Sequence, residues 1–113
     1  MTEKVSIRRQ DRLPAPMIHL ASAEDLAAWY VSQLAWELEQ GQTELSISCF
    51  DTAPMGYGSV QAAYAVLRAV TGFLYDHPQA EHLSILCGDD EALRAYSFQW
   101  NMWYAEHKPG HGT

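Results

Sequence analysis

The sequence predicts an α/β fold, in the form of a three-layer α/β/α sandwich around a small sheet of three or four mainly parallel or mixed strands. Short apolar runs alternate along the chain with longer segments in which apolar residues recur every three or four positions. Glycines such as Gly41 and Gly88 follow these segments. Strands that alternate with helices of this length imply right-handed crossovers and helices on both faces of the sheet.

The first helix is predicted to begin after Ser22, a favourable N-cap residue with Asp25 three positions on. Its large apolar residues recur every four positions and form one stripe for burial: Leu26, Tyr30, Leu34 and Leu38. Gly41 then provides a natural C-terminal stop.

Two strands are predicted in the second half of the chain, over 45–50 and 82–87. The first alternates large apolar residues with small ones, and Ser46 and Ser48 are small enough to lie beneath a packed helix. We therefore expect the 45–50 strand to be buried on both faces and to be the central strand of the fold.

A helix is predicted after each of these two strands. One begins at Ser59 or Val60 and ends before Pro78, which is unsuited to continuing a helix. The other is capped by Asp89 or Asp90, because a carboxylate satisfies unpaired N–H groups of a first turn.

The beginning of the chain gives weaker signals. The alternation in Val5-Ser-Ile7 suits a short edge strand, and 17–21 is predicted as a further short strand. We expect an N-terminal arm or edge strand over 1–10, a single α/β domain over 11–107 and a flexible tail over 108–113.

Composition excludes several classes of function. The formal net charge of −7 argues against a general nucleic-acid-binding surface, which needs clustered Lys and Arg. No apolar stretch is long enough to span a membrane, and the N-terminus lacks the apolar core of a secretory signal. Cys49 and Cys87 both lie in apolar runs, which favours reduced core thiols in a cytoplasmic protein. A disulfide between neighbouring strands stays open as an alternative.

The segment between the 45–50 strand and the following helix is a candidate anion-binding loop, because unpaired N–H groups of a loop and a first helical turn can point at one spot. The candidate ligand residues are Asp51, Thr52, Ala53, Met55, Gly56, Tyr57, Gly58 and Ser59. The alternative interpretation is a tight strand–helix turn that needs Gly56 and Gly58 for backbone freedom.

Three segments resemble the later part of a macro domain, the ADP-ribose-binding fold. Asp11-Arg-Leu-Pro-Ala-Pro-Met-Ile-His19 is similar to the G-R-L-P-x-x-x-V-I-H segment of that family. Leu26 to Gly41 resembles the helix that follows it, and Ser46 to Gly58 lies over the I-A-F-P-x-I-S-T-G-x-x-G-Y-P strand and phosphate loop. The resemblance extends over residues 11–106, and it implies a truncated macro-domain-like fold.

The resemblance implies a possible ligand, ADP-ribose or a related nucleotide, held by the 51–58 loop. The opening part of the family pattern, which carries an adenine-contacting Asp and a catalytic Asn, has no counterpart in this sequence. In the loop, Asp51, Ala53 and Pro54 depart from the family pattern. We therefore expect a non-catalytic module that works through oligomer or protein-partner contacts, with weak nucleotide or phosphate binding at the loop. The alternative is an ADP-ribose binder or processor whose pocket is completed by dimerisation.

An aromatic face is predicted on the last helix, and it is either core with a partly exposed rim or a surface for protein contacts. Its candidate interaction residues are Trp100, Trp103 and Tyr104. The resemblance also implies an exposed sheet edge where the early family strands are missing. Because an uncovered apolar edge favours aggregation, we expect a homo-oligomer or a protein partner to cover it.

Other polar residues give no site that the sequence favours. His19 follows a predicted strand, where a structural hydrogen bond is the simpler role. Asp51, Asp89 and Asp90 follow two strand ends, where a cation site is the alternative to helix capping. Pro and Gly interrupt the segment between His107 and His111. We therefore expect no metal, no cofactor and no catalytic residue.

Overall fold

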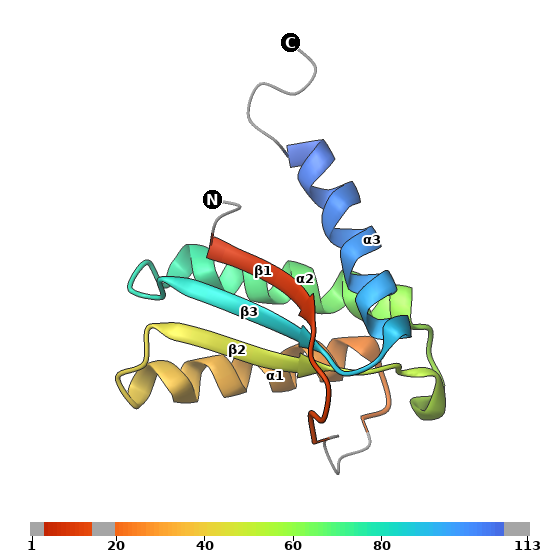
Figure 1. The fold of residues 1–113 in the computed structure, drawn as a ribbon. Coiled ribbons are helices and arrows are strands. Elements are labelled where there is room, and N and C mark those ends of the chain that lie inside the picture. The colour runs from red at the N-terminus through yellow and green to blue at the C-terminus, as the bar shows by residue number, and fades with distance from the viewer. Residues whose placement is uncertain (1–3, 15–19, 108–113) are drawn as a thin grey trace.

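The computed structural model describes residues 4–14 and 20–107 of the chain (Figure 1). Its elements follow one another as β1 Val5–Arg9, α1 Ala23–Glu39, β2 Glu44–Cys49, the 3₁₀ turn η2 Ala53–Met55, α2 Ser59–Asp76, β3 His82–Cys87 and α3 Asp90–His107. Three helices and a three-stranded parallel sheet confirm the α/β class that the sequence predicts. The expected edge strand near the N-terminus is β1.

The strands lie in the order β1-β3-β2, and both pairings are parallel. Val5 and Leu45 flank Leu83 in register, and Ser6 and Ser46 flank Ser84 one position later. The central strand is therefore β3. The expectation that the 45–50 strand is central is wrong, because β2 lies at an edge of the sheet.

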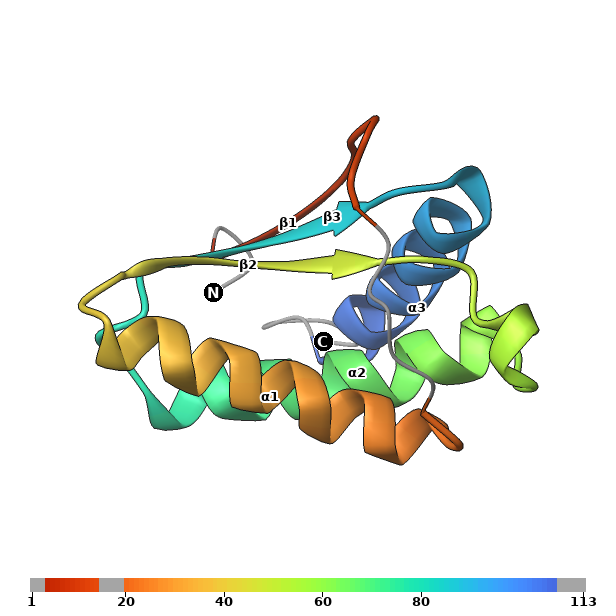
Figure 2. The same ribbon diagram turned by 90° about the horizontal axis from the view of Figure 1, so that it is seen from below.

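All three helices lie on one face of the sheet (Figure 2). The residues of β2 and β3 that point to this face are buried, namely Leu45, Ile47, Cys49, Leu83, Ile85 and Cys87. On the opposite face Ser46 is exposed and Ser48 and Ser84 are half-buried. Helices on both faces, and a β2 strand buried on both faces, were expected and are not found in the described part of the chain. The alternation of large and small residues in β2 is that of a sheet covered on one side.

The two crossovers have opposite hands. The chain moves across the sheet in one direction from β1 to β2 and in the other from β2 to β3, while α1 and α2 pack side by side on the same face (Figures 1 and 2). The β2–α2–β3 crossover is right-handed, so β1–α1–β2 is left-handed, against the expected hand. A connection of thirteen residues, 10–22, separates β1 from α1. A connection of this length restricts the hand of a crossover less than a short loop does.

The helix boundaries follow the local signals in the sequence. Ser22 caps α1, since its Oγ accepts a hydrogen bond from the N–H of Asp25 at 3.1 Å. Gly41 follows the end of α1 with a φ of +88°, a conformation that glycine adopts without a steric penalty. The predicted stripe of α1 packs into the core, with Leu26, Tyr30 and Leu34 buried. α2 begins at Ser59, as predicted.

The predicted strand over 17–21 falls largely outside the described residues. Leu20 and Ala21, which the structure describes, belong to no strand. His19, the residue at the end of that predicted strand, also lies outside the described part of the chain.

Candidate functional site

The 51–58 loop lies at the carboxyl end of β2, where ligands of open α/β sheets commonly bind. Its centre is the 3₁₀ turn Ala53–Met55, which Pro54 favours near its start. Gly56 follows with a φ of +100°, so a side chain at this position would be strained. The loop is therefore a tight turn with a defined internal geometry.

The carboxylate of Asp51 occupies the interior of this turn. Its Oδ1 accepts a hydrogen bond from the Ser59 hydroxyl at 2.7 Å and another from the Ala53 N–H at 3.0 Å. Both hydrogen bonds lower the pKa of Asp51, the one from Ser59 more than the one from Ala53, so the carboxylate form is favoured. Asp51 thus supplies, from within the chain, the negative charge that a bound anion would bring.

Four further N–H donors of the turn are also used within the chain. The N–H of Thr52 donates to Ser59 Oγ at 3.2 Å, and the N–H of Asp51 donates to Asp89 Oδ2 at 2.9 Å. The N–H groups of Met55 and Gly56 donate to the carbonyls of Thr52 and Ala53. Five N–H groups, those of 51, 52, 53, 55 and 56, are therefore satisfied by the protein itself.

The first turn of α2 has fewer side-chain partners than the turn before it. Its N-cap is Gly58, no side chain caps it, and no acidic residue lies in its first turn. No carboxylate within that turn offsets the partial positive charge of the helix N-terminus, although the Asp51 carboxylate accepts a hydrogen bond from Ser59, the first residue of α2. This is the feature of the loop that remains compatible with an anion. Tyr57, half-buried beside it, has its pKa raised by burial.

The three carboxylates expected at one rim are brought to the same edge of the sheet but have different partners. Asp89 caps α3 by accepting from the Ala92 N–H at 2.7 Å, and its other oxygen accepts from the N–H of Asp51. Asp90 pairs with Arg9 at 3.0 Å instead. Across residues 4–14 and 20–107, no three His, Cys, Asp or Glu side chains gather as metal ligands.

Cys49 and Cys87 stand opposite each other in the register of β2 and β3, and both are buried free thiols. Burial raises the pKa of Cys49 to about 12 and that of Cys87 to about 11. Since the thiolate is the nucleophile, we expect these thiols to be unreactive in the folded protein. Elsewhere, His82 shares a 3.0 Å hydrogen bond with Ser6 Oγ on the open face of the sheet.

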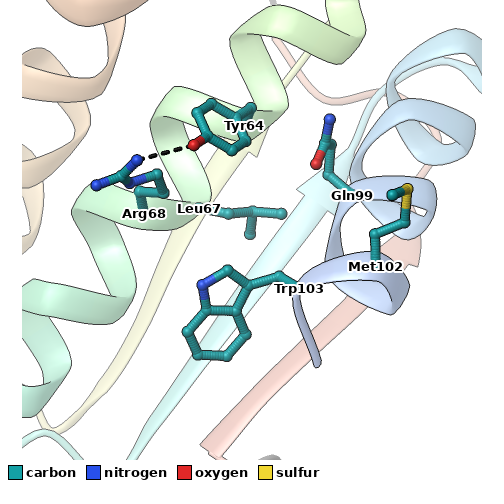
Figure 3. Close-up of a pocket in the computed structure, with 6 residues that line it drawn as sticks. All are labelled: Tyr64, Leu67, Arg68, Gln99, Met102 and Trp103. Carbon is teal, nitrogen blue, oxygen red and sulfur yellow. Dashed lines mark hydrogen bonds between the residues drawn. The ribbon is translucent and has the colours of Figure 1, made fainter. Parts of the chain in front are cut away.

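A groove lies between α2 and α3, with a volume of about 220 Å³ (Figure 3). We call it the α2–α3 groove, and it is lined by Tyr64, Leu67, Arg68, Gln99, Met102 and Trp103. The guanidinium of Arg68 lies 5.4 Å from the centroid of the Tyr64 ring and donates a 2.8 Å hydrogen bond to its hydroxyl. The lining is aromatic and aliphatic, and its one cation is the guanidinium of Arg68. Such a lining suits a side chain that has an apolar body and a polar end.

The expected aromatic face of α3 is divided between core and groove. Trp100 packs against the core and stacks on Trp103, with ring centroids 5.5 Å apart. Trp103 also lines the groove, whereas the side chain of Tyr104 lies outside the described part. The sequence interpretation missed Tyr64, Arg68 and Met102. The four-residue spacing from Tyr64 to Arg68 was the available signal, because it places both on one side of α2.

Exposed apolar side chains concentrate on the same two helices. The large hydrophobic residues that the structure describes as exposed are Trp36, Val60, Tyr64, Tyr75, Phe98 and Met102. All but Trp36 belong to α2 or α3, and Tyr75 is the most exposed of them at 88%. Of these residues, Tyr64 and Met102 meet at the α2–α3 groove, and contiguous exposed apolar patches mark interaction surfaces.

No protein-family model matches the chain, and no curated protein is similar to it. In the described part of the chain, no helix combines the length and the apolar character that crossing a bilayer requires.

Proposed function

We propose that this protein is a non-catalytic module that works through protein contacts made by α2 and α3. The observation that carries the proposal is the gathering of Tyr64, Tyr75, Phe98 and Met102 on these two helices. Tyr and Trp side chains supply much of the binding energy of protein interfaces, and Trp103 lines the groove between the helices.

The chemistry of the polar residues supports a binding role over catalysis. The two thiols are buried with raised pKa values, and Asp51 and Asp89 make hydrogen bonds that stabilise turns and helix ends. Neither the described carboxylates nor the described thiols form a nucleophile paired with a base. A cytoplasmic location is part of this proposal, supported by the two free thiols.

A second candidate is weak binding of an ADP-ribose-like nucleotide or phosphate at the 51–58 loop. It is favoured by one observation, the first turn of α2, which has no side-chain cap and no acidic residue. The Asp51 carboxylate opposes it, because an incoming phosphate would meet a negative charge that already satisfies the turn. A macro-domain relationship is likewise a proposal, and it rests on the sequence motifs.

Site-specific photo-crosslinking tests the main proposal. A photoreactive amino acid in place of Met102 reports contacts beside the groove, and the same amino acid in place of Trp36 is the matched control on α1. We expect cross-links to protein from position 102 and few from position 36, in cells that express the chain. Equal yields from both positions would contradict the proposal.

Calorimetric titration with ADP-ribose tests the second candidate. Submillimolar binding by the wild type that is lost in Gly56→Val would support it, since a branched side chain is strained at the positive φ of this residue. Absence of heat would leave protein contacts as the function.

A further inference from the structure

We propose that the α2–α3 groove is filled by a second copy of this chain, in a two-fold contact where α2 lies antiparallel to the α2 of its partner and crosses it at Gly72. This inference rests on the proposed function and deepens it, because it names the partner and the geometry. Three independent features of α2 support it: an exposed stripe, an unexplained glycine and two oppositely charged residues placed symmetrically about that glycine.

The exposed stripe of α2 runs along most of the helix. It consists of Gln61, Tyr64, Arg68, Gly72 and Tyr75, all of them exposed. Their separations of three and four residues place them on one side of the helix, opposite the buried side that faces the core. A stripe with this spacing is the pattern by which one helix packs along another.

Gly72 has no role within the chain that requires glycine. It lies inside α2, its φ is outside the left-handed range, and a Cβ added to it would meet nothing within 4 Å. Glycine inside a helix costs about 1 kcal/mol relative to alanine. The absence of a side chain would, however, let a second helix approach the backbone closely at this point, as glycine does at tight helix crossings.

Charges placed about Gly72 are complementary under a two-fold axis. Arg68 and Asp76 lie four residues to either side of it, about 6 Å along the helix axis. In an antiparallel pair that crosses at Gly72, Arg68 of one copy therefore faces Asp76 of the other, and symmetry makes the contact twice. Neither side chain has an ion pair within residues 4–14 and 20–107.

Tyr75 provides the apolar anchor of the same contact. It lies three residues beyond Gly72, so it faces the turn of the partner's α2 that contains Arg68. That turn lines the partner's groove, where Leu67 and Met102 offer apolar contact. The groove is smaller than the roughly 300 Å³ at which small-molecule pockets begin, so a single inserted side chain suits it better than a cofactor.

Sedimentation equilibrium of the purified full chain tests the inference through charge reversal. We expect a dimer at micromolar concentration, whose dissociation constant rises about tenfold or more in Arg68→Glu and in Asp76→Arg. Because the two residues lie more than two turns apart in one helix, the double variant should restore the dimer only if they meet across an interface. A double variant as weak as the single ones would overturn the proposed contact.

Gly72→Leu and Tyr75→Glu test the crossing point and the anchor. Both positions are exposed, and leucine favours helix, so circular dichroism should show the folded state retained. We expect both variants to be monomeric, while Trp36→Glu, an exposed aromatic changed in the same way on α1, remains dimeric. A dimer that Gly72→Leu leaves unchanged would contradict the crossing at Gly72.

The outcomes separate this inference from the proposed function. If the wild type is a monomer throughout the micromolar range but position 102 cross-links to a different protein, the homodimer is wrong and the interaction module stands. If the wild type is a monomer and position 102 gives no protein cross-links, both proposals fail.

Discussion

The Asp51 carboxylate accepts a 2.7 Å hydrogen bond from the Ser59 hydroxyl, and this contact closes the turn between β2 and α2. The same carboxylate oxygen accepts from the N–H of Ala53. Asp51 was predicted from the sequence as a candidate ligand of a bound anion. In the structure its carboxylate instead occupies the position that such an anion would take. The first two predictions follow from this relationship.

Replacement of Asp51 by Asn should destabilise the protein in a pH-dependent manner. The pKa of Asp51 is lowered in the folded state from its usual value of 3.8, so its contribution to stability is present above that value and is lost as pH falls through the folded pKa. Urea unfolding should show a difference between wild type and Asp51→Asn at pH 7 that shrinks below about pH 4. A difference that stays constant down to pH 2 would contradict this role.

Replacement of Asp51 by Ala should release the N–H of Ala53 and the hydroxyl of Ser59 for an external anion. We expect sulfate to raise the melting temperature of Asp51→Ala more than that of the wild type, because only the variant has an unoccupied turn. Sodium chloride at equal ionic strength is the control. Equal stabilisation of both proteins by sulfate would indicate a non-specific salt effect.

The thiols of Cys49 and Cys87 should be unreactive in the native protein. Both are buried, with pKa values raised to about 12 and about 11, so very little thiolate forms at pH 8. A chromogenic thiol reagent should detect two rapidly reacting groups in guanidinium and none in buffer. Rapid reaction of either thiol in buffer would show that β2 and β3 open locally more often than their burial implies.

Gly88 should not tolerate alanine, because an added Cβ would overlap the ring of Phe50. We expect Gly88→Ala to lower the free energy of unfolding by about 1–3 kcal/mol, the usual cost of overpacking. The double variant Gly88→Ala/Phe50→Leu should recover part of that loss, since it removes the overlapping ring atoms. If the double variant loses the sum of the two single effects, the two residues are not coupled.

Gly72→Ala should have the opposite effect on the isolated chain. No atom lies within 4 Å of the added methyl group, and the helix gains up to about 1 kcal/mol from the loss of a flexible residue. Chemical unfolding at submicromolar concentration, where the proposed dimer is dissociated, measures this gain. A loss of stability at that concentration would reveal a packing constraint within the chain.

Elements with local signals could be predicted from the sequence. The cap at Ser22, the start of α2 at Ser59 and the strand over 82–87 each depend on neighbouring residues, and all three are found in the structure. The position of a strand in the sheet depends on pairings between distant segments, so local patterns led to the wrong place for 45–50. Ser46 and Ser48 are compatible with a covered face and with an open one, and their pattern does not separate the two.

The candidate site was predictable to a smaller extent. The turn at 51–58 and its glycine at 56 follow from chain-local chemistry, but the use of Asp51 as an internal acceptor depends on the position of Ser59 across the turn. The groove depends on α2 and α3 meeting, and these helices are separated by a whole strand. No local pattern reports the angle at which two helices meet, so Tyr64 and Met102 could not be paired from sequence.

The position of β1 at an edge of the sheet has a consequence for the order in which the strands unfold locally. Val5 pairs with Leu83, so the chain closes a loop of 78 residues to form this edge of the sheet, whereas β2 and β3 are joined through α2 by a shorter one. Closing the longer loop costs more entropy, and β1 gains hydrogen bonds from a single neighbouring strand in return. Backbone amides of β1 should therefore exchange with deuterium before those of β3, and the vacated edge of β3 would be the template on which a β1 strand from another molecule exchanges.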